Sequence, residues 1–313
     1  MNILERLPGI EKDVLLSGHT TFKIGGPAKY FFVAENREDV VNAVTAARES
    51  GLSLFILGGG SNLLVSDRGF GGLVIRPQIS SLKFQDNTII AGAGVSLSKL
   101  VTESVNNNLT GFEWAAGIPG TVGGAVVVNA GAYGRSMSDS VKTVIAVSAN
   151  DGSCKEYKNS DCGFVYRGSR FGGGSEIIVE IVLNLEKGNK EQILQKIKGI
   201  ILERGGKNPP QPSAGSVFKN YRLKDSDPLI EQFPDWAEKI RSGKIAAGYL
   251  IEQCGLKGKQ IGGAKIPEEH ANFIVNLGGA RAEDVVALIR LCQDGVKKRY
   301  NIVLEEEVRY LGF

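Results

Sequence analysis

Residues 115–134 constrain the fold more than any other part of this chain. This stretch places six glycines among small and β-branched residues and contains neither a lysine nor an acidic residue. Glycine destabilises the interior of helices and strands, so this density indicates turns or close backbone approaches that a side chain would block. Because N–H groups in such a loop bind phosphate or carbonyl oxygens without a basic side chain, the stretch predicts a site for a large oxygen-rich ligand.

A second glycine-rich loop lies upstream. Residues 54–57 form a short apolar run that predicts a buried strand, and Gly58-Gly59-Gly60-Ser61-Asn62 follows it directly. A strand that leads into several glycines can present backbone N–H groups to a diphosphate. Either loop alone is as readily a tight turn, whereas two such loops in one half of the chain favour a binding function.

The usual nucleotide-binding signatures do not fit these loops. Counted from Gly58, the dinucleotide fingerprint needs glycine or alanine at Leu63, and counted from Gly92 it needs one at Leu97. The sequence also lacks the Gly-Lys-Ser/Thr ending of the phosphate loop. These departures argue against a Rossmann dehydrogenase and a phosphate-loop nucleotide hydrolase, and they leave a large nucleotide cofactor held by another loop geometry.

Length, charge and cysteine content narrow the class of protein. A chain of 313 residues has room for two or three domains, and a net charge of +3 is too small for a basic nucleic-acid-binding protein. We expect no signal peptide and no membrane span, since no segment approaches ~20 apolar residues. Four cysteines without metal-type spacing and two histidines predict no metal site and free thiols in a reducing cytoplasm.

Hydrophobic spacing predicts two small units before the clearest break in the chain. The expected elements of these units are a helix at 38–50, strands at 54–57, 73–75 and 88–91, a helix after Ser96 through 105, strands at 141–148 and 177–185, and a helix at 190–204. Three prolines at 209, 210 and 212 then exclude a continuing helix and predict a domain boundary. Beyond it we expect helices at 246–254 and 282–300 and a last strand at 302–310.

Several polar segments are candidates for chemistry, although residue spacing alone does not select among them. Ser216, with Lys219 and Asn220 close behind it, is either a proton donor beside an anion-binding lysine or part of a polar turn. Arg167 and Arg170 suit carboxylate recognition, and they equally suit a solvated loop. Without further context, the structural alternative is favoured for each segment: a polar turn for the one with Ser216 and a solvated loop for the one with Arg167.

The acidic run near the end of the chain also leaves a choice open. Strand alternation puts Glu306 on the more apolar face and Glu307 on the opposite one, and it does not select a catalytic acid. Neither of the two histidines, His19 and His270, has a nearby acid and nucleophile in the arrangement by which a triad is recognised, which favours structural roles for both.

Taken together, these segments resemble the UDP-N-acetylenolpyruvoylglucosamine reductases, the MurB family of flavin enzymes in peptidoglycan synthesis. The resemblance runs in order over nearly the whole chain and rests on Thr20-Thr21-Phe22-Lys23-Ile24-Gly25-Gly26, Gly58-Gly59-Gly60-Ser61-Asn62-Leu63, residues 115–134, Tyr166-Arg167-Gly168-Ser169, Gly215-Ser216-Val217-Phe218-Lys219-Asn220, Ala247-Gly248-Tyr249-Leu250-Ile251-Glu252, Ile261-Gly262-Gly263-Ala264, His270-Ala271-Asn272-Phe273-Ile274-Val275-Asn276 and Glu307-Val308-Arg309. Each motif alone is weak, and their common order is highly specific.

The resemblance implies an α+β fold in which a two-part FAD-binding unit of the vanillyl-alcohol-oxidase type precedes a C-terminal α+β substrate-binding domain. The corresponding ranges are 1–80, 81–205 and 206–313, with the last strand packing back on the FAD-binding part. It also implies a cytoplasmic enzyme that is a monomer or a weak homo-oligomer, and that binds small molecules, not nucleic acid or membranes.

The resemblance further implies the reaction. NADPH reduces FAD, and the flavin N5 passes hydride to the methylene carbon of the enolpyruvyl ether of UDP-N-acetylglucosamine. A proton reaches the carbon next to the carboxylate, and UDP-N-acetylmuramate results. Carried onto this chain, Ser216 is the proton donor, while Arg167 and Glu307 polarise the substrate carboxyl and stabilise the enolate-like intermediate. An arginine preplaced where charge develops favours the transition state.

The family motifs also imply the binding residues. The expected FAD contacts come from the two glycine-rich loops: Leu57, Gly58, Gly59, Gly60, Ser61, Asn62, Leu63, Ala116, Gly117, Ile118, Pro119, Gly120, Thr121, Gly123, Gly124, Ala125, Asn129, Gly131, Ala132 and Tyr133. With no histidine or cysteine in these loops, we expect the FAD to be non-covalent. The expected substrate contacts are Tyr166, Lys219 (nearest the diphosphate), Asn220, Gln260, His270 and Asn272.

Two features depart from the common family pattern. Tyr221 stands where proline commonly follows Lys-Asn, and the short segment between Arg170 and Ser216 lacks the tyrosine-bearing insertion of one subclass, so the chain resembles the shorter subclass. Competing readings are a sugar or hydroxy-acid oxidase of the same fold and a non-catalytic flavin- or UDP-sugar-binding protein. The joint presence of Ser216, Arg167 and Glu307 in their motifs argues against both.

Overall fold

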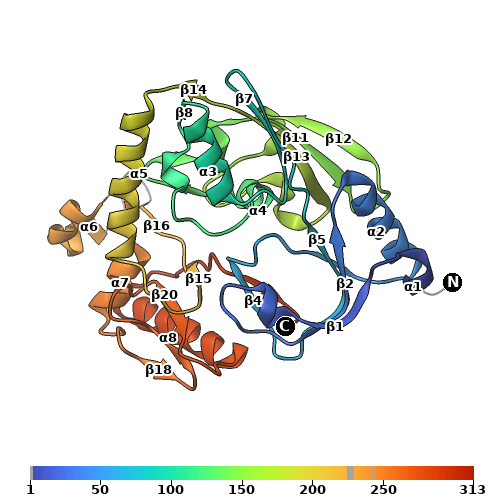
Figure 1. Ribbon diagram of the computed structural model, residues 1–313. Helices are drawn as coiled ribbons and strands as arrows, with labels where there is room; N and C mark the ends of the chain where they lie inside the picture. The colour runs from blue at the N-terminus through green and yellow to red at the C-terminus, as the bar shows by residue number, and fades with distance from the viewer. Residues whose placement is uncertain (1–2, 224–228, 241–242) are drawn as a thin grey trace. The chain divides into compact units, whose positions relative to one another are not determined.

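The computed structural model describes residues 3–223, 229–240 and 243–313, and these form two compact units (Figure 1). Unit 1 comprises the chain up to Val14, Pro27–Gly59 and Phe70–Gly206. Unit 2 comprises Leu15–Gly26, Gly60–Gly69 and Lys207–Phe313. The division between Gly206 and Lys207 lies within the proline- and glycine-rich break. It differs from the predicted range 1–80 in that two early segments belong to unit 2.

The first sheet of unit 1 contains three parallel strands. Its order is β1 (Glu11–Leu15), β2 (Pro27–Ala34), β5 (Phe70–Pro77) and β3 (Leu54–Ile56), and β5 pairs in parallel with both β2 and β3. Helix α2 (Arg37–Glu49) connects β2 to β3, and the Asn36 side chain caps it by accepting from the Asp39 N–H at 2.9 Å. The predicted helix at 38–50 is thereby confirmed within a residue at each end.

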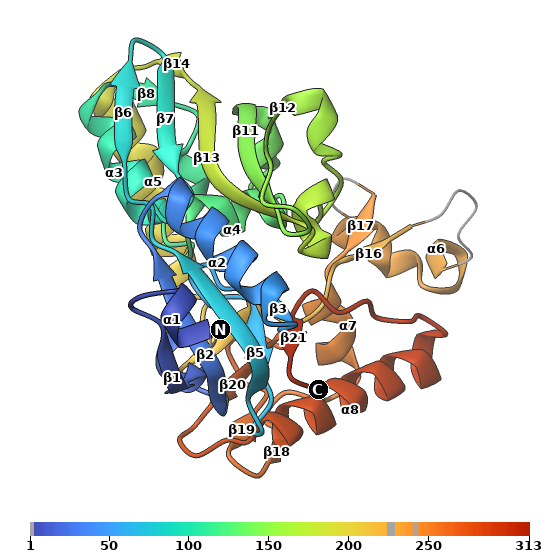
Figure 2. The ribbon, with the colours of Figure 1, turned by 90° about the vertical axis from the view of Figure 1, so that its right-hand side faces the viewer.

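The second sheet of unit 1 is antiparallel throughout. Its order is β12 (Cys154–Lys158), β11 (Val141–Ser148), β13 (Glu176–Asn184), β7 (Thr88–Gly92) and β6 (Leu82–Gln85). Buried residues of α2, such as Val40 and Val44, share one core with residues of both sheets, and Figure 2 shows α2 running beside β5. The helix is thus apolar on the side that two sheets cover.

A separate core of unit 1 lies under its remaining helices. Buried side chains of α3 (Leu97–Asn106) and α4 (Val122–Val127) pack with residues of β7, β11 and β13, and α5 (Lys190–Gly205) contributes the half-buried Ile197 and Ile200. The predicted cap of α3 is confirmed, because the Ser96 hydroxyl accepts from the Lys99 N–H at 3.1 Å. Two short strand pairs complete the unit, β8 (Leu109–Thr110) with β14 (Glu186–Lys187) and β9 (Gly131–Ala132) with β10 (Arg135–Ser136).

Unit 2 combines a small antiparallel sheet with two helices. The sheet order is β15 (Ser213–Ser216), β20 (Phe273–Asn276), β19 (Ala264–Lys265) and β18 (Gln260–Ile261). Helices α7 (Ala247–Gln253) and α8 (Ala282–Tyr300) share its core, and α8 has the predicted bounds. A further pair, β16 (Tyr221–Arg222) with β17 (Lys244–Ile245), starts at Tyr221, the residue that departs from the family pattern.

The last predicted strand is much shorter than expected. The sequence predicts a strand over 302–310, whereas β21 covers Arg309–Leu311 and pairs in parallel with β4 (Leu63–Val65). The reason is a change of partner along this segment. The carbonyl of Glu305 accepts from Lys219 N–H (2.8 Å), and the Glu307 N–H donates to Val217 O (2.7 Å), before Arg309 N–H donates to Asn62 O (3.1 Å).

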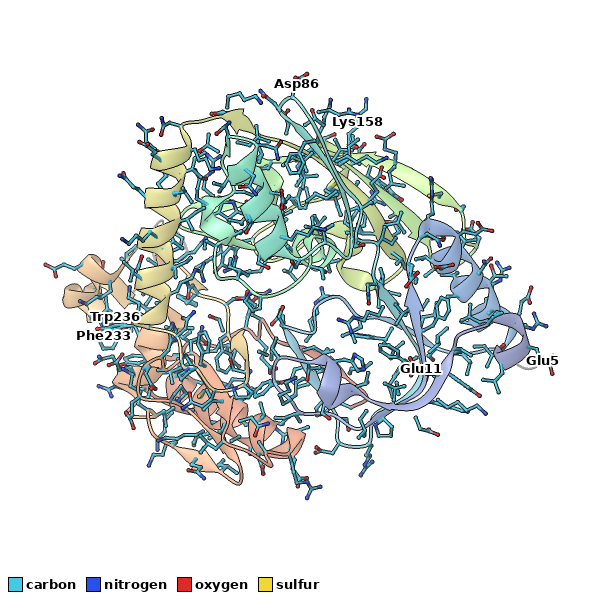
Figure 3. All side chains as sticks on the ribbon, viewed as in Figure 1. Glu5, Glu11, Asp86, Lys158, Phe233 and Trp236 are labelled. Atoms are coloured by element: carbon cyan, nitrogen blue, oxygen red, sulfur yellow. The ribbon has the colours of Figure 1, made fainter. Side chains whose placement is uncertain are left out.

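Short elements fill the connections. The remaining helices are α1 (Ile3–Arg6), α6 (Leu229–Gln232) and the 3₁₀ turns at Leu16–His19, Glu113–Ala115, Met137–Asp139, Asn159–Cys162, Arg170–Gly173 and Pro234–Lys239. Figure 3 labels Phe233 and Trp236, whose rings stack at 4.5 Å between centroids in unit 2. Within the described ranges, the structure has no helix with the length and apolar character needed to cross a membrane.

Candidate active site

The two glycine-rich loops meet backbone to backbone within unit 1. A Cβ built on Gly59 would lie 2.7 Å from the Cα of Gly120, and one on Gly58 would lie 3.0 Å from the Thr121 hydroxyl oxygen. Gly120 itself has φ +129°, a conformation that residues with a side chain rarely adopt. The glycine pattern therefore reflects a close approach of two loops in addition to any ligand.

Only some of the N–H groups in these loops are available to a ligand. The N–H groups of Val122 and Gly123 donate to Val95 O (2.8 Å) and Ala93 O (2.9 Å), and that of Gly124 donates to the Thr121 hydroxyl (3.2 Å). The start of α4 is thus satisfied internally. Thr121 and Gly124, two of the expected FAD contacts, are engaged with each other.

Four other glycine N–H groups have no such partner. Those of Gly58, Gly59, Gly117 and Gly120 donate to no acceptor in the part of the chain that the structure describes. Since bare N–H groups without a protein acceptor are suited to phosphate oxygens, the residues present fit the diphosphate of a flavin dinucleotide.

Two charged residues that the sequence did not single out hold the second loop in place. The Glu113 carboxylate accepts from the Thr110 hydroxyl (2.6 Å) and the Gly111 N–H (2.7 Å). Burial acts to raise the pKa of Glu113, but these hydrogen bonds and Lys196 outweigh it and lower the pKa, so the residue stays ionised.

The second of these residues is Arg204, in the last turn of α5. Its Nη2 donates to Trp114 O at 3.3 Å, and its guanidinium carbon lies 5.4 Å from the centre of the Tyr133 ring. Arg204 therefore contacts the loop at both ends of its length. No local spacing in the sequence predicts this, because about 70 or more residues separate Arg204 from its contacts.

Arg167 lies at the tip of a tight turn in unit 1. Val165 and Gly168 exchange N–H···O bonds of 3.0 and 3.2 Å, and Arg167 between them has φ +60°. Its Nη1 donates to Gly131 O at 3.0 Å, and its guanidinium carbon lies 5.2 Å from the centre of the Tyr166 ring. Arg167 is half-buried and attached to the second glycine-rich loop, so the solvated-loop reading is wrong for this residue.

Unit 2 brings Ser216 and the Glu307 segment together. Ser216 ends β15, directly after Gly215 with φ +75°, and its hydroxyl has no hydrogen-bond partner among the described residues. The next residue, Val217, accepts the Glu307 N–H at 2.7 Å. Asn62, which was expected at the flavin, donates its Nδ2 to Glu307 O at 3.0 Å.

The neighbouring acid, Glu306, is occupied by structural contacts. Its Oε1 accepts from Gln293 Nε2 on α8 at 3.1 Å, and its Oε2 accepts from the Tyr310 hydroxyl. Burial, followed by the contact with Glu306, raises the pKa of Tyr310 well above its usual range, so the phenol stays protonated and donates. Both oxygens of Glu306 therefore anchor the segment that carries Glu307.

Among the expected substrate contacts, Asn272 is the most deeply buried. Its side-chain Oδ1 accepts from Phe218 N–H (3.0 Å) and its Nδ2 donates to Phe218 O (2.9 Å), while its own carbonyl accepts from Val217 N–H (2.8 Å). Asn272 thus supports the backbone that follows Ser216. His270 is next to it, and its Nδ1 accepts from the Asn272 N–H at 3.2 Å.

The imidazole of His270 is neutral. Burial is the main cause that lowers its pKa, and an accepting Nδ1 places the proton on Nε2. Its ring centre lies 4.7 Å from that of Phe273. A structural role, which its sequence context favours, and the substrate contact implied by the resemblance both stay predictions for His270.

The remaining expected substrate contacts are more exposed. Lys219 Nζ lies 3.3 Å from Glu305 Oε2, Asn220 Oδ1 accepts from the Ala247 N–H at 3.2 Å where α7 begins, and Gln260 Nε2 donates to Gly262 O at 3.0 Å. The Lys219 pair is exposed, so it contributes little stability and opens readily.

In the described segments, no three histidine, cysteine or acidic residues gather in a metal-holding group.

Comparison with known proteins finds relatives of both parts of the chain. Residues 28–157 match the model of an FAD binding domain, and residues 208–311 match the C-terminal domain of UDP-N-acetylenolpyruvoylglucosamine reductase. The chain is 40% identical to the UDP-N-acetylenolpyruvoylglucosamine reductase of Alkaliphilus oremlandii over 303 residues, which are 96% of this chain and 92% of that one. It is also 40% identical to that of Caldanaerobacter subterraneus over 94% of this chain and 91% of the relative.

A solved structure extends the similarity to the whole fold. The crystal structure of MurB from Thermus caldophilus matches with a TM-score of 0.77 and 35% identity, over 97% of this chain and 99% of that one. The chain belongs to the UDP-N-acetylenolpyruvoylglucosamine reductase family. As a MurB protein it is an FAD-dependent oxidoreductase of peptidoglycan synthesis. The predicted fold class, an FAD-binding part followed by a substrate-binding domain, is confirmed.

We predict that Gly59→Ala weakens FAD binding. A methyl group at this position would meet the Gly120 backbone at 2.7 Å, so the loops must separate. Displacements of this kind cost about 1–3 kcal/mol, which corresponds to a roughly tenfold to hundredfold higher Kd. Fluorescence titration of the flavin-free protein with FAD measures the change.

The matched control for this substitution is Gly199→Ala. Gly199 lies within α5, and a Cβ there would meet nothing within 4 Å. We expect an unchanged Kd for FAD and a slightly higher Tm, because alanine favours the helix. An unchanged Kd in Gly59→Ala would contradict the inferred role of the loop contact.

We predict that Asn272→Leu destabilises the protein. The substitution leaves the N–H and C=O of Phe218 buried without partners, which costs about 2–4 kcal/mol in the free energy of unfolding. Urea unfolding measures the loss, and the exposed Asn184→Leu on β13 serves as control, with an expected change within about 0.5 kcal/mol. Equal stabilities of the two variants would show that the Asn272 amide supports nothing.

Proposed function

We propose that this enzyme reduces the enolpyruvyl ether of UDP-N-acetylglucosamine to UDP-N-acetylmuramate, with NADPH as the electron source. Membership of the family supports the reaction class. The observation that carries the proposal is the 2.7 Å hydrogen bond from Glu307 N–H to Val217 O, since it joins the backbones beside Ser216 and Glu307. These are the two residues of unit 2 to which we assign proton transfer and carboxyl polarisation.

The proposal includes a non-covalent FAD held by the two glycine-rich loops. The unsatisfied N–H groups of Gly58, Gly59, Gly117 and Gly120 are suited to its diphosphate oxygens. Held there, FAD would supply the redox chemistry that couples oxidation of NADPH to reduction of the substrate.

We assign Arg167 to the substrate carboxylate. As hydride arrives at the methylene carbon, negative charge develops on the adjacent carbon and spreads into the carboxylate. A guanidinium held in advance stabilises that charge without reorganising at the moment of reaction. The hydrogen bond from Arg167 Nη1 to Gly131 O supports such a preset orientation.

We assign Ser216 as the proton donor and Glu307 as the second residue that contacts the substrate carboxyl. A serine hydroxyl is a weak acid, so it protonates only a basic, enolate-like carbon. Among the described residues, the Ser216 hydroxyl has no hydrogen-bond partner that would compete with the substrate. Glu307 is assigned to contact the substrate carboxyl from a second side and to help stabilise the enolate-like intermediate. Ser216 regains its proton from solvent.

The proposal also includes the cellular compartment of the enzyme and the residue that binds the substrate's diphosphate. We infer a cytoplasmic enzyme, because all four cysteines are free, as a reducing compartment favours. We assign Lys219 to the diphosphate, since its exposed contact with Glu305 is weak enough to exchange for a phosphate oxygen.

The first test is an anaerobic stopped-flow trace of the flavin band near 450 nm. We expect bleaching on mixing with NADPH and recovery on adding UDP-N-acetylglucosamine enolpyruvate. Bleaching without recovery would show that the protein binds a reducible flavin but does not reduce this substrate. A larger bleaching rate with NADH than with NADPH would reverse the assigned coenzyme.

We predict that Ser216→Ala and Glu307→Gln separate the two halves of the reaction. Bleaching by NADPH should stay within about twofold of wild type, while recovery by substrate slows by roughly 10²–10⁴-fold, the usual contribution of a positioned acid. Controls of the same type are Ser104→Ala, in a buried helix position, and Glu186→Gln on exposed β14. Loss of bound FAD in either active-site variant would make that residue structural.

A further inference from the structure

The turn that carries Arg167 is joined to the second glycine-rich loop by three hydrogen bonds. Ser169 Oγ donates to Val127 O at 2.8 Å, Asn129 Nδ2 donates to Val165 O at 3.0 Å, and Arg167 Nη1 donates to Gly131 O at 3.0 Å. Alternate residues of the turn, 165, 167 and 169, thus each bind the segment 127–131. Two of these contacts lie on either side of the arginine.

The conformation of the turn needs such support. Arg167 has φ +60°, which costs energy for a residue with a long side chain and persists only where surrounding contacts enforce it. The reciprocal bonds between Val165 and Gly168 close the turn, but they do not attach it to anything else. The three hydrogen bonds described above attach it to residues 127–131 of the second glycine-rich loop.

The Ser169 hydroxyl is committed to this attachment. Ser169 occupies the N-cap position of the 3₁₀ turn Arg170–Gly173, where a serine ordinarily accepts from the turn's own N–H groups, yet its side chain makes no capping hydrogen bond. It donates to Val127 O instead. Asn129, in contrast, also accepts from the Ser138 N–H at 3.0 Å, so it is part of the internal structure of the glycine-rich loop.

We propose that Ser169 is a positioning residue that holds Arg167 in register with the second glycine-rich loop. The inference rests on the proposed role of Arg167 and extends it to a residue that does not touch the substrate. Without the hydroxyl, the loop keeps its own contacts, while the turn loses the hydrogen bond that joins it to the loop on the C-terminal side of the arginine. A small displacement of a preset charge is enough to slow a reaction considerably.

The test separates the two half-reactions in Ser169→Ala and uses Ser104→Ala as the matched control. Ser104 is in the same unit, and its hydroxyl also donates to a backbone carbonyl at 2.8 Å, within α3. In Ser169→Ala we expect full FAD content, a bleaching rate by NADPH within about twofold, and recovery by substrate slowed about tenfold. Ser104→Ala should leave both rates unchanged.

A double-mutant cycle then asks whether Ser169 acts through Arg167. In an Arg167→Ala background, already slow in recovery, Ser169→Ala should add less than about a twofold effect. A further tenfold loss there would overturn the inference, as would an unchanged recovery rate in the single variant. Loss of FAD in Ser169→Ala would also overturn it, because the residue would then support the flavin. If Arg167→Ala itself recovered normally, the role proposed for the arginine would fall, and the inference with it.

Discussion

The backbone of Gly59 lies against that of Gly120 with no room for a side chain between them, and the candidate flavin site depends on this contact. It closes two loops, which are about 60 residues apart in sequence, into one surface of unit 1. On that surface, the N–H groups at the start of α4 donate to acceptors within the protein. The N–H groups of Gly58, Gly59, Gly117 and Gly120 have no acceptor among the described residues and can bind a ligand. Glycine is required here for packing as much as for ligand contact.

Both loops also support residues to which we assign chemistry. The first continues into Asn62, whose side chain holds the carbonyl of Glu307, and the second continues into residues 127–131, which bind the Arg167 turn. The same segments that would contact a flavin therefore position groups that would contact the substrate. An enzyme that must align a hydride donor with a charged substrate gains accuracy from such shared support.

Sequence patterns predicted the parts of the structure that depend on local order. The cap of α3 at Ser96 and the bounds of α8 follow from hydrophobic spacing and capping chemistry, and ordered motifs indicated the family. The predicted length of the strand at 302–310 is too great. Its side chains do alternate between buried and exposed positions, but its backbone changes hydrogen-bond partner from residues 217–219 to residues 62–65. Pairing partners are non-local, and periodicity within one segment carries no information on them.

The contacts of individual site residues are also non-local, so the sequence pattern around each residue does not reveal them. The family motifs imply ligand contacts for Asn62, Asn129 and Asn272, and the structure shows that their side-chain amides also hold backbone groups of distant segments. Arg204 and Glu113 were missed because their partners are defined by the fold or by a short turn. An amide side chain suits either use equally well, so only the surroundings distinguish them.

The pairing of β4 with β21 has a consequence for how this protein can be divided. The core of unit 2 includes Phe22, Ile24 and Leu64, and the hydrogen bond between Asn62 and Glu307 spans 245 positions. A fragment cut at the proline-rich break would lack these apolar side chains and would expose β21 as an unpaired edge. The substrate-binding domain is therefore not a portable module. Exchanging it between family members would require transferring the two early segments with it.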